Sequence, residues 1–288
     1  MTGATGFMGS NLLRRLVAEN KRVILLKRTS SNLFRISDLL DRVQTYCVEN
    51  INLEKIFKTE KVDAVLHCAT NYGRKVESPY SILEANLMLP LKLLQIGADN
   101  GLKCFINTDT ILDKRVSYYS LSKSQFRDWL KLYSDRLICG NVALEHFFGP
   151  GDDETKFVTL MVRSLLRRNP KIPLTLGEQK RDFIYIDDVV EAFSSILRRL
   201  PGKRKGFYPF EIGRGSTISV REFMLLLKKL TANRTTKLDF GAIPYRENEV
   251  MESKVNLAEI RALGWSPTVS LLSGLKRTIK SEKGRLNK

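Results

Sequence analysis

Short apolar, β-branched runs alternate with amphipathic helical patterns along the first half of the chain. Residues 22–28 (RVILLKR), 62–70 (VDAVLHCAT) and 103–110 (KCFINTDT) predict buried strands. Residues 9–20 and 82–100 carry apolar positions at helical spacing between those strands. Alternation of this kind is typical of a parallel sheet with helices on both faces, so the sequence predicts an α/β fold.

The pattern changes near residue 152, after a helical pattern at 119–135 and a strand at 136–152 that ends in a Gly-Pro-Gly turn. The helices expected beyond it are 157–168, 187–200 and 216–230, and the short strands are 182–186 and 208–212. Ser219 and Glu222 have the spacing of a helical capping box. We expect residues 1–151 to form one domain and 152–288 mainly a smaller lobe at the carboxyl edge of the sheet, where open α/β sheets bind ligands.

Basic residues outnumber acidic ones by 48 to 31, which gives a formal net charge of +17. They are dispersed, with local clusters at RRNPK, RRLPGKRKG and the C-terminal tail, and no zinc-finger or RNA-recognition motif accompanies them. We interpret most of this charge as a solvated surface and expect no nucleic-acid partner. A few basic groups are candidates for binding a phosphorylated substrate.

No apolar run approaches the ~20 residues of a membrane span, and the first residues do not have the pattern of a signal peptide. The four cysteines (Cys47, Cys68, Cys104 and Cys139) are widely spaced, so we expect reduced thiols in a cytoplasmic protein. His67 and His146 have no companions at metal-ligand spacing, so no metal site is expected. We interpret His67 as a packing residue, whereas His146 could contact a substrate or make structural hydrogen bonds.

Gly3, Gly6 and Gly9 in MTGATGFMGS have the spacing of a dinucleotide-binding turn. Glycines let the backbone turn tightly and approach a pyrophosphate, which rests on the amide-rich start of the following helix. An acidic residue at the end of the next strand would favour NAD, but Arg28 stands there, beside Lys27. With help from Ser30, these cations favour NADP(H), and NAD(H) remains possible.

Only Met1 and Thr2 precede this turn, which normally follows a buried strand. Such a strand would lie between the strands at 22–28 and 62–70 and pair on both sides. Its absence would forfeit roughly 1.5–3 kcal/mol for each large apolar side chain that it buries. We therefore expect the natural chain to begin several residues upstream of Met1.

Tyr119 and Lys123 are four residues apart, so they share one face of the predicted helix. A lysine in this position lowers the pKa of the phenol, which lets Tyr119 exchange a proton with a sugar oxygen while nicotinamide exchanges hydride. Thr108, at the end of the strand at 103–110, can hydrogen-bond the same oxygen. Thr108, Tyr119 and Lys123 are the catalytic candidates.

The glycine turn, Thr108 and Tyr119-x-x-x-Lys123 resemble, in this order, the extended short-chain dehydrogenase/reductase family, which acts on nucleotide sugars. Asn86 in EANLMLPLKLL and the segments LHCAT, FFGPGD and RDFIYIDDVVEAF match further family motifs. The resemblance spans nearly the whole chain and implies a Rossmann-like doubly wound parallel sheet, a smaller C-terminal substrate lobe and a homodimer. The cofactor contacts that it implies are Gly3, Thr5, Gly6, Phe7, Met8, Gly9, Arg28, Ala69, Tyr119 and Lys123.

FINTDT, LEHFFGPGDDETKF, TLGEQKRDFIYIDDVV and FGAIPYRENEVM are similar to the branch of this family that comprises the CDP-abequose synthases. This resemblance implies NADPH-dependent reduction of the 4-keto group of a CDP-linked dideoxyhexose for lipopolysaccharide O-antigen. Ala143 stands where that branch usually has an arginine, which leaves the identity of the sugar open. The expected substrate contacts are Tyr72, Asp109, Lys156, Arg181 and Arg246; Arg181 could equally pair with Asp182 or Asp187.

Other reactions of the family remain as alternatives. Nucleotide-sugar 4,6-dehydratases carry Thr-Asp-Glu where this chain has Thr108-Asp109-Thr110, so dehydration lacks its proton-abstracting carboxylate. Asp109 is then a structural residue or a substrate contact. A 4-epimerase that keeps NAD bound would use the same Tyr119 and Lys123. A catalytically silent nucleotide-binding protein is a further alternative, against which the intact tyrosine–lysine pair argues.

Overall fold

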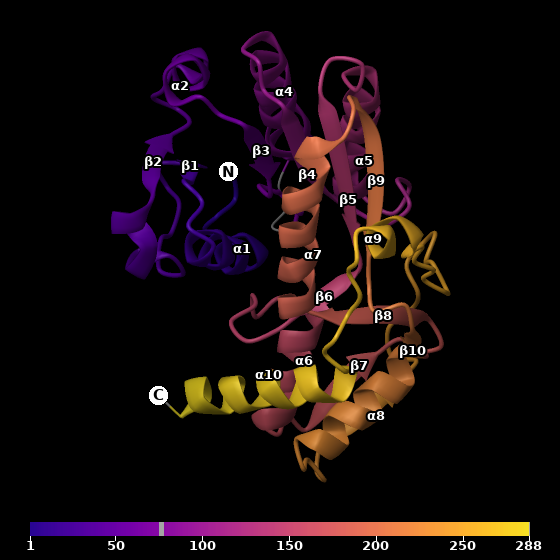
Figure 1. The fold of residues 1–288 in the computed structure, drawn as a ribbon. Helices are drawn as coiled ribbons and strands as arrows, with labels where there is room; N and C mark the ends of the chain where they lie inside the picture. The colour runs from indigo at the N-terminus through magenta and orange to yellow at the C-terminus, as the bar shows by residue number, and fades with distance from the viewer. Residues whose placement is uncertain (75–77, 288) are drawn as a thin grey trace. The chain divides into compact units, whose positions relative to one another are not determined.

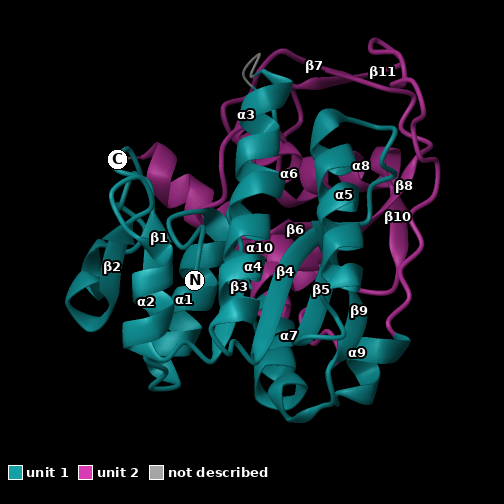
Figure 2. Ribbon diagram, turned by 90° about the horizontal axis from the view of Figure 1, so that it is seen from above, with its two compact units in different colours: residues 1–144, 190–212, 258–265 teal, residues 145–189, 213–257, 266–288 magenta. Residues whose placement is uncertain are grey.

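The computed structural model describes residues 1–74 and 78–287, and the chain divides into two compact units (Figures 1 and 2). Unit 1 consists of residues 1–144, 190–212 and 258–265, and unit 2 of residues 145–189, 213–257 and 266–288. The first break therefore lies after residue 144, and two later stretches of chain return to unit 1.

A parallel sheet forms the centre of unit 1. Its strands, in sheet order, are β2 (Gln44–Cys47), β1 (Ile24–Lys27), β3 (Ala64–His67), β4 (Cys104–Thr110), β5 (Ile138–Leu144) and β9 (Gly206–Ile212). Thr2 lies between β1 and β3, where it makes parallel bridges to Leu26 and His67. This single residue holds the sheet position that we predicted for a strand before the glycine turn.

Helices cover both faces of this sheet. On one face, α2 (Leu53–Glu60), α4 (Leu89–Asp99) and α5 (Tyr118–Leu132) pack against buried residues that include Phe105 and Cys139. On the other, Leu200 packs over Gly140, where an added Cβ would lie 2.7 Å from the leucine side chain. The expected α/β, Rossmann-like doubly wound architecture is confirmed.

Leu200 directly follows α7 (Ile186–Arg199), whose residues from 190 onward belong to unit 1. This part of α7 is joined to α1 (Phe7–Ala18) by ion pairs of Arg15 with Glu191 and of Arg198 with Glu19. α1 buries the apolar side chains of its predicted inner face, Leu12, Leu13, Leu16 and Val17.

Two of the expected elements differ from the structure. The pattern at 82–100 predicts one helix, but the chain forms α3 (Pro79–Leu83), a π-helical turn η2 (Glu84–Met88) and then α4. The strand at 208–212, which we placed with the smaller lobe, belongs to β9 and extends the sheet of unit 1 by pairing with β5. Strand pairing over this sequence distance leaves no local signal, which explains the second error.

Unit 1 also contains three short elements, the 3-10 helices η1 (Ser37–Arg42) and η3 (Leu200–Gly202) and the helix α9 (Ala258–Ala262).

Unit 2 contains two small sheets. One has the order β10 (Thr217–Ser219), β8 (Lys180–Tyr185), β6 (His146–Phe148), and the other pairs β11 (Lys237–Phe240) with β7 (Lys171–Leu174). Its helices are α6 (Phe157–Leu166), α8 (Val220–Leu230) and α10 (Leu271–Leu286), together with the first residues of α7. Ser219 and Glu222 form the predicted capping box at the start of α8. Unit 2 thus contains both helices and strands, as expected for the smaller α/β lobe.

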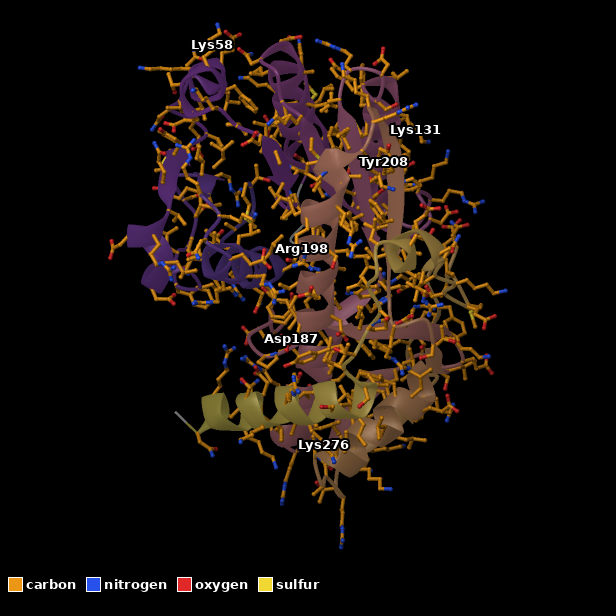
Figure 3. The ribbon with its side chains drawn as sticks, viewed as in Figure 1. Lys58, Lys131, Asp187, Arg198, Tyr208 and Lys276 are labelled. Atoms are coloured by element: carbon orange, nitrogen blue, oxygen red, sulfur yellow. The ribbon has the colours of Figure 1, made fainter. Side chains whose placement is uncertain are left out.

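Basic side chains come from many separate elements of both units. Figure 3 labels four of them, Lys58 on α2, Lys131 on α5, Arg198 on α7 and Lys276 on α10. In the ranges that the structure describes, no helix combines the length and the apolar character that crossing a membrane requires.

Candidate active site

The glycine turn is packed so closely that side chains are excluded from it. Gly3 has a φ of +68°, and an added Cβ would lie 2.4 Å from the Ala69 nitrogen. An added Cβ on Gly9 would lie 2.1 Å from the carbonyl oxygen of Gly3. The turn therefore brings the start of α1 directly against the segment that follows β3, and the predicted contact Ala69 lies beside it.

The N-terminus of α1 has the donor set that a pyrophosphate requires. Gly6 is its exposed N-cap residue, and within the described residues no side chain caps the helix and its first turn contains no acidic residue. The backbone amides at a helix N-terminus and the helix dipole favour an anion at this position. Thr5 lies in the turn, and the buried Phe7 and Met8 begin the helix. These residues fit the diphosphate of a dinucleotide.

Thr2, which the sequence motif did not single out, joins the glycine turn to the segment that follows β3. Its hydroxyl oxygen accepts hydrogen bonds from the backbone nitrogens of Cys68 and Ala69, each at 3.2 Å. It also lies 2.9 Å from Nδ1 of His67. Burial lowers the pKa of His67 well below its ordinary value, with a smaller contribution from the Lys123 charge. His67 is therefore a neutral packing residue here, and its ring lies against those of Phe105 and Phe126.

An acidic residue, Glu49, lies beside the segment that follows β1, and the sequence analysis did not identify it. Arg28, the predicted 2′-phosphate contact, is exposed, and its binding of a 2′-phosphate stays a prediction. The Glu49 carboxylate, however, accepts hydrogen bonds from the Thr29 nitrogen at 3.2 Å and lies near Arg28, whose charge contributes to lowering the pKa of Glu49. Lys27 does not join Arg28, because its Nζ lies 3.4 Å from the Cys47 sulfur.

The three catalytic candidates come together between β4 and α5. Nζ of Lys123 donates a hydrogen bond to the backbone oxygen of Thr108 at 2.9 Å, and the Thr108 hydroxyl donates to the backbone oxygen of His67 at 2.8 Å. Lys123 is 1% exposed. Its burial lowers the pKa of the amine to about 8, against a raising effect from Asp109 and Cys68.

Tyr119 lies one helical turn before Lys123, with its ring centroid 5.0 Å from that of Tyr72. Burial raises the pKa of Tyr119 well above its ordinary value, Tyr72 adds to this, and a side-chain hydrogen bond with Thr110 works in the opposite direction. Our expectation of a lowered phenol pKa is therefore wrong for the protein alone. The cost of burying a phenolate dominates, and the Lys123 amine bonds to a carbonyl oxygen instead.

Asp109 lies on the opposite side of β4 from Thr108 and Thr110, and its side chain is fully buried. The carboxylate accepts hydrogen bonds from Nε of Arg127 at 2.6 Å and from Nδ2 of Asn141 at 2.8 Å. These bonds match the structural role that the sequence left open. A direct contact between Asp109 and a substrate stays a prediction.

Asn86 connects the loop that carries Tyr72 to α5. Its Oδ1 accepts from the nitrogen of Asn71, and its Nδ2 donates to the oxygen of Asn71, both at 2.8 Å. Nδ2 also donates to the Ser122 hydroxyl at 3.0 Å. The family match at this residue thus coincides with a buried clamp, located in the π-helical turn that interrupts the predicted helix.

The remaining substrate candidates belong to unit 2. Arg181 is largely buried and pairs with Glu249, and it also donates to the oxygen of Val250 at 2.6 Å. It pairs with neither of the two aspartates that we considered, since Asp182 accepts from the nitrogens of Arg214 and Gly215, and Asp187 pairs with Arg277. Lys156 is the N-cap residue of α6, and Arg246 is exposed. Their contacts with a substrate stay predictions.

His146 has structural partners within the same unit. Its Nδ1 lies 3.0 Å from the Glu145 carboxylate, which is buried and also bonds to the Ser253 hydroxyl. The ring packs edge-on against Phe183. In the described part of the chain, no three histidine, cysteine, aspartate or glutamate side chains gather as a metal site.

Comparisons with known proteins agree with this geometry. A family model described as "NAD dependent epimerase/dehydratase family" matches residues 1–213. A CDP-abequose synthase from Salmonella muenchen is 33% identical to this chain, over 97% of the chain and 96% of the relative. One from Salmonella typhimurium is 31% identical, again over 97% and 96%. The crystal structure of UDP-glucose 4-epimerase from Thermotoga maritima with UDP-glucose has a TM-score of 0.83, with 24% identity, 99% of this chain covered and 98% of that chain, which shows the shared fold.

Proposed function

Because this chain belongs to the NAD-dependent epimerase/dehydratase family, we propose that it reduces the 4-keto group of a nucleotide-activated deoxyhexose with NADPH. The observation that carries the proposal is the junction of Thr108, Tyr119 and Lys123 between β4 and α5. The likeness to two CDP-abequose synthases over nearly the whole chain supports a CDP-linked 3,6-dideoxyhexose as substrate. The product would serve lipopolysaccharide O-antigen synthesis.

NADPH, when bound, supplies the hydride that the C4 carbon takes up. The phenol of Tyr119 gives its proton to the C4 oxygen, so the C=O bond becomes CH–OH and a phenolate remains on the protein. The raised pKa of free Tyr119 keeps the phenol protonated and ready to act as the acid. Lys123, one turn away on the same helical face, then stabilises the phenolate by its charge.

Residues of the chain would hold the two ligands in distinct ways. The glycine turn and the N-terminus of α1 fit the cofactor diphosphate, and Arg28 is the group for a 2′-phosphate. Tyr72, next to Tyr119, would contact the sugar. Lys156, Arg181 and Arg246 are the proposed diphosphate contacts on the substrate, because guanidinium forks and ammonium groups match phosphate oxygens.

The decisive test is NADPH oxidation, followed at 340 nm, against CDP-, dTDP-, GDP- and UDP-linked 4-keto-6-deoxyhexoses, including 3-deoxy forms. We expect the CDP-linked 3,6-dideoxy-4-ketohexose to give the highest kcat/KM. Tyr119→Phe should lower kcat by about 10²–10⁴-fold without loss of NADPH binding. Full activity in this variant, or tightly held NAD with no net oxidation of NADPH, would overturn the proposal; the second result would instead support a 4-epimerase.

We also propose a homodimer through the helices at α4 and α5. On α5, Leu121, Trp129 and Leu132 are exposed at spacings that put them on one helical face, and Leu132 is 70% exposed. Leu132→Glu should give a monomer in light-scattering chromatography, whereas Leu225→Glu, at an exposed leucine of α8 in unit 2, should leave the mass unchanged. A monomeric wild-type protein would contradict this.

A cytoplasmic location remains a proposal from the cysteine pattern.

A further inference from the structure

Tyr119, Lys123 and Arg127 lie on one face of α5 at steps of four residues and meet the end of β4. Lys123 bonds to the backbone oxygen of Thr108, as described above, and Arg127 bonds to the side chain of Asp109, the next residue of the strand. Two adjacent residues of β4 are thus tied to two adjacent turns of the helix. Any rotation or slide of α5 along β4 must break at least one of these bonds.

The Asp109 carboxylate accepts three hydrogen bonds in this arrangement. Besides Arg127, it accepts from Nδ2 of Asn141 at 2.8 Å and from the Thr110 nitrogen at 2.7 Å. Asn141 is itself oriented by a 2.9 Å bond from Nδ2 of Asn107. The side chain of Asp109 is 0% exposed, whereas that of Arg127 is 33% exposed. An acid held in this way is fixed in orientation by three hydrogen bonds, and its charge acts on its neighbours.

The charge of Asp109 acts on Lys123 and on Tyr119. It raises the pKa of Lys123, which burial lowers, and it adds to the raised pKa of Tyr119. The other groups that act on Lys123 and Tyr119 are Cys68, Tyr72, Arg74 and Thr110, and Lys123 in turn acts on His67. Among these groups, Asp109 is the one carboxylate that acts on both catalytic candidates, and Arg127 is its counterion.

We propose that Asp109 and Arg127 are a positioning pair that fixes α5 against the end of β4 and keeps Lys123 charged beside Tyr119. This role rests on the proposed function and adds two residues to its machinery. Asp109 acts through Lys123 and Tyr119 rather than on the substrate. Arg127 acts through Asp109, as its counterion and by holding its carboxylate in place.

The first test measures Lys123 directly and needs no substrate. Lysine labelled with ¹³C at Cε reports its own titration by NMR, and Lys123→Met identifies the Lys123 signal. Asp109→Asn keeps the size of the side chain and removes its charge, so the pKa of Lys123 should fall by ~1 unit. Arg127→Gln leaves the Asp109 charge uncompensated, so the pKa of Lys123 should rise. Shifts of the same sign, or no shift in folded variants, would overturn the proposal.

The second test measures catalysis. Both variants should lower kcat by about tenfold at pH 7 while KM for NADPH changes little, and Arg127→Lys should recover part of kcat. The alkaline limb of the kcat profile should move to lower pH in Asp109→Asn and to higher pH in Arg127→Gln. Asp99→Asn, which breaks an exposed ion pair with Arg136 in the same unit, should leave kcat and its profile unchanged.

The two tests separate this inference from the proposed function. If the wild-type protein has no reductase activity, the proposed function is wrong. If the pKa of Lys123 still falls in Asp109→Asn and rises in Arg127→Gln, the effect of the pair on Lys123 is nevertheless supported. An active reductase with unchanged kcat in both variants would contradict the pair alone. Unfolding curves of each variant show whether the fold is intact.

Discussion

The ammonium group of Lys123 donates a hydrogen bond to the backbone oxygen of Thr108, with the two atoms 2.9 Å apart in a site where the lysine is almost fully buried. Burying a charged amine is costly, and a carbonyl oxygen compensates only part of the lost hydration. The fold thus contains a buried amine one helical turn from Tyr119, at a cost in free energy. This cost has a measurable consequence for the stability of the fold.

The first prediction concerns the pH dependence of that stability. Lys123 has a pKa of about 8 in the folded protein against an ordinary value of 10.5, so the unfolded chain binds more protons between these values. The penalty for the charged lysine is present in full below pH 8 and is relieved as the pH rises toward 10.5. Each pH unit in this range adds about 1.4 kcal/mol to the free energy of unfolding. Relative to Lys123→Met, the wild-type protein should therefore gain free energy of unfolding between pH 8 and 10 in urea titrations. A constant difference between the two proteins would contradict this.

The second prediction concerns Gly9, whose added Cβ would lie 2.1 Å from the Gly3 oxygen. The atoms that this Cβ would meet, in Gly3 and Ala4, belong to the backbone, so relief requires the turn and α1 to separate. Gly9→Ala should lower the free energy of unfolding by about 1–3 kcal/mol and weaken NADPH binding, followed by its fluorescence, by at least about tenfold. Gly284→Ala is the matched control, because among the described residues no atom beyond its chain neighbours and the adjoining backbone of α10 lies within 4 Å of its added Cβ. That change should stabilise α10 slightly, since alanine is the better helix former.

The sequence predicted the strands and helices around the site because each has a strong local period and a boundary signal. It could not predict the break at Asn86, because the π-helical turn accompanies bonds to Asn71 and Ser122 that a helical period does not contain. Thr2, Glu49 and Arg127 were missed for a related reason. Each acts on residues that folding brings near, so no spacing along the chain marks it. The raised pKa of Tyr119 likewise depends on burial and on Tyr72, which the Tyr-x-x-x-Lys motif does not encode.

The third prediction concerns Asn86 itself. Asn86→Ala removes three hydrogen bonds from a fully buried position and leaves the backbone groups of Asn71 without this partner. At about 1 kcal/mol for each bond, with more for unsatisfied groups, the free energy of unfolding should fall by about 2–4 kcal/mol. Asn100→Ala, which removes one side-chain bond at the end of α4, should cost no more than about 1 kcal/mol. Equal losses in the two variants, measured by urea unfolding, would show that the clamp contributes nothing beyond one ordinary hydrogen bond.

The last prediction concerns the choice between NADPH and NADH, which two opposite charges after β1 and β2 should set together. Glu49 is exposed and held by the Thr29 nitrogen, and hydrogen bonds from backbone groups together with the Arg28 charge lower its pKa, so it is ionised at neutral pH. In this proposal Arg28 would attract a 2′-phosphate, while Glu49 would repel it and partly neutralise Arg28. Arg28→Ala should weaken NADPH binding by about tenfold and leave NADH binding nearly unchanged.

Glu49→Gln should do the reverse: it should strengthen NADPH binding several-fold and keep the hydrogen bonds of the loop. Both effects should shrink between 0.05 and 0.5 M NaCl, because exposed charges are screened over a Debye length of about 10 Å at 0.1 M salt. Calorimetric titration of each variant with NADPH and with NADH gives four ratios of variant to wild-type dissociation constant. If Arg28→Ala weakened the binding of both cofactors equally, Arg28 would contact a group that they share, such as the diphosphate, and the proposed role of Arg28 in selecting NADPH would be wrong.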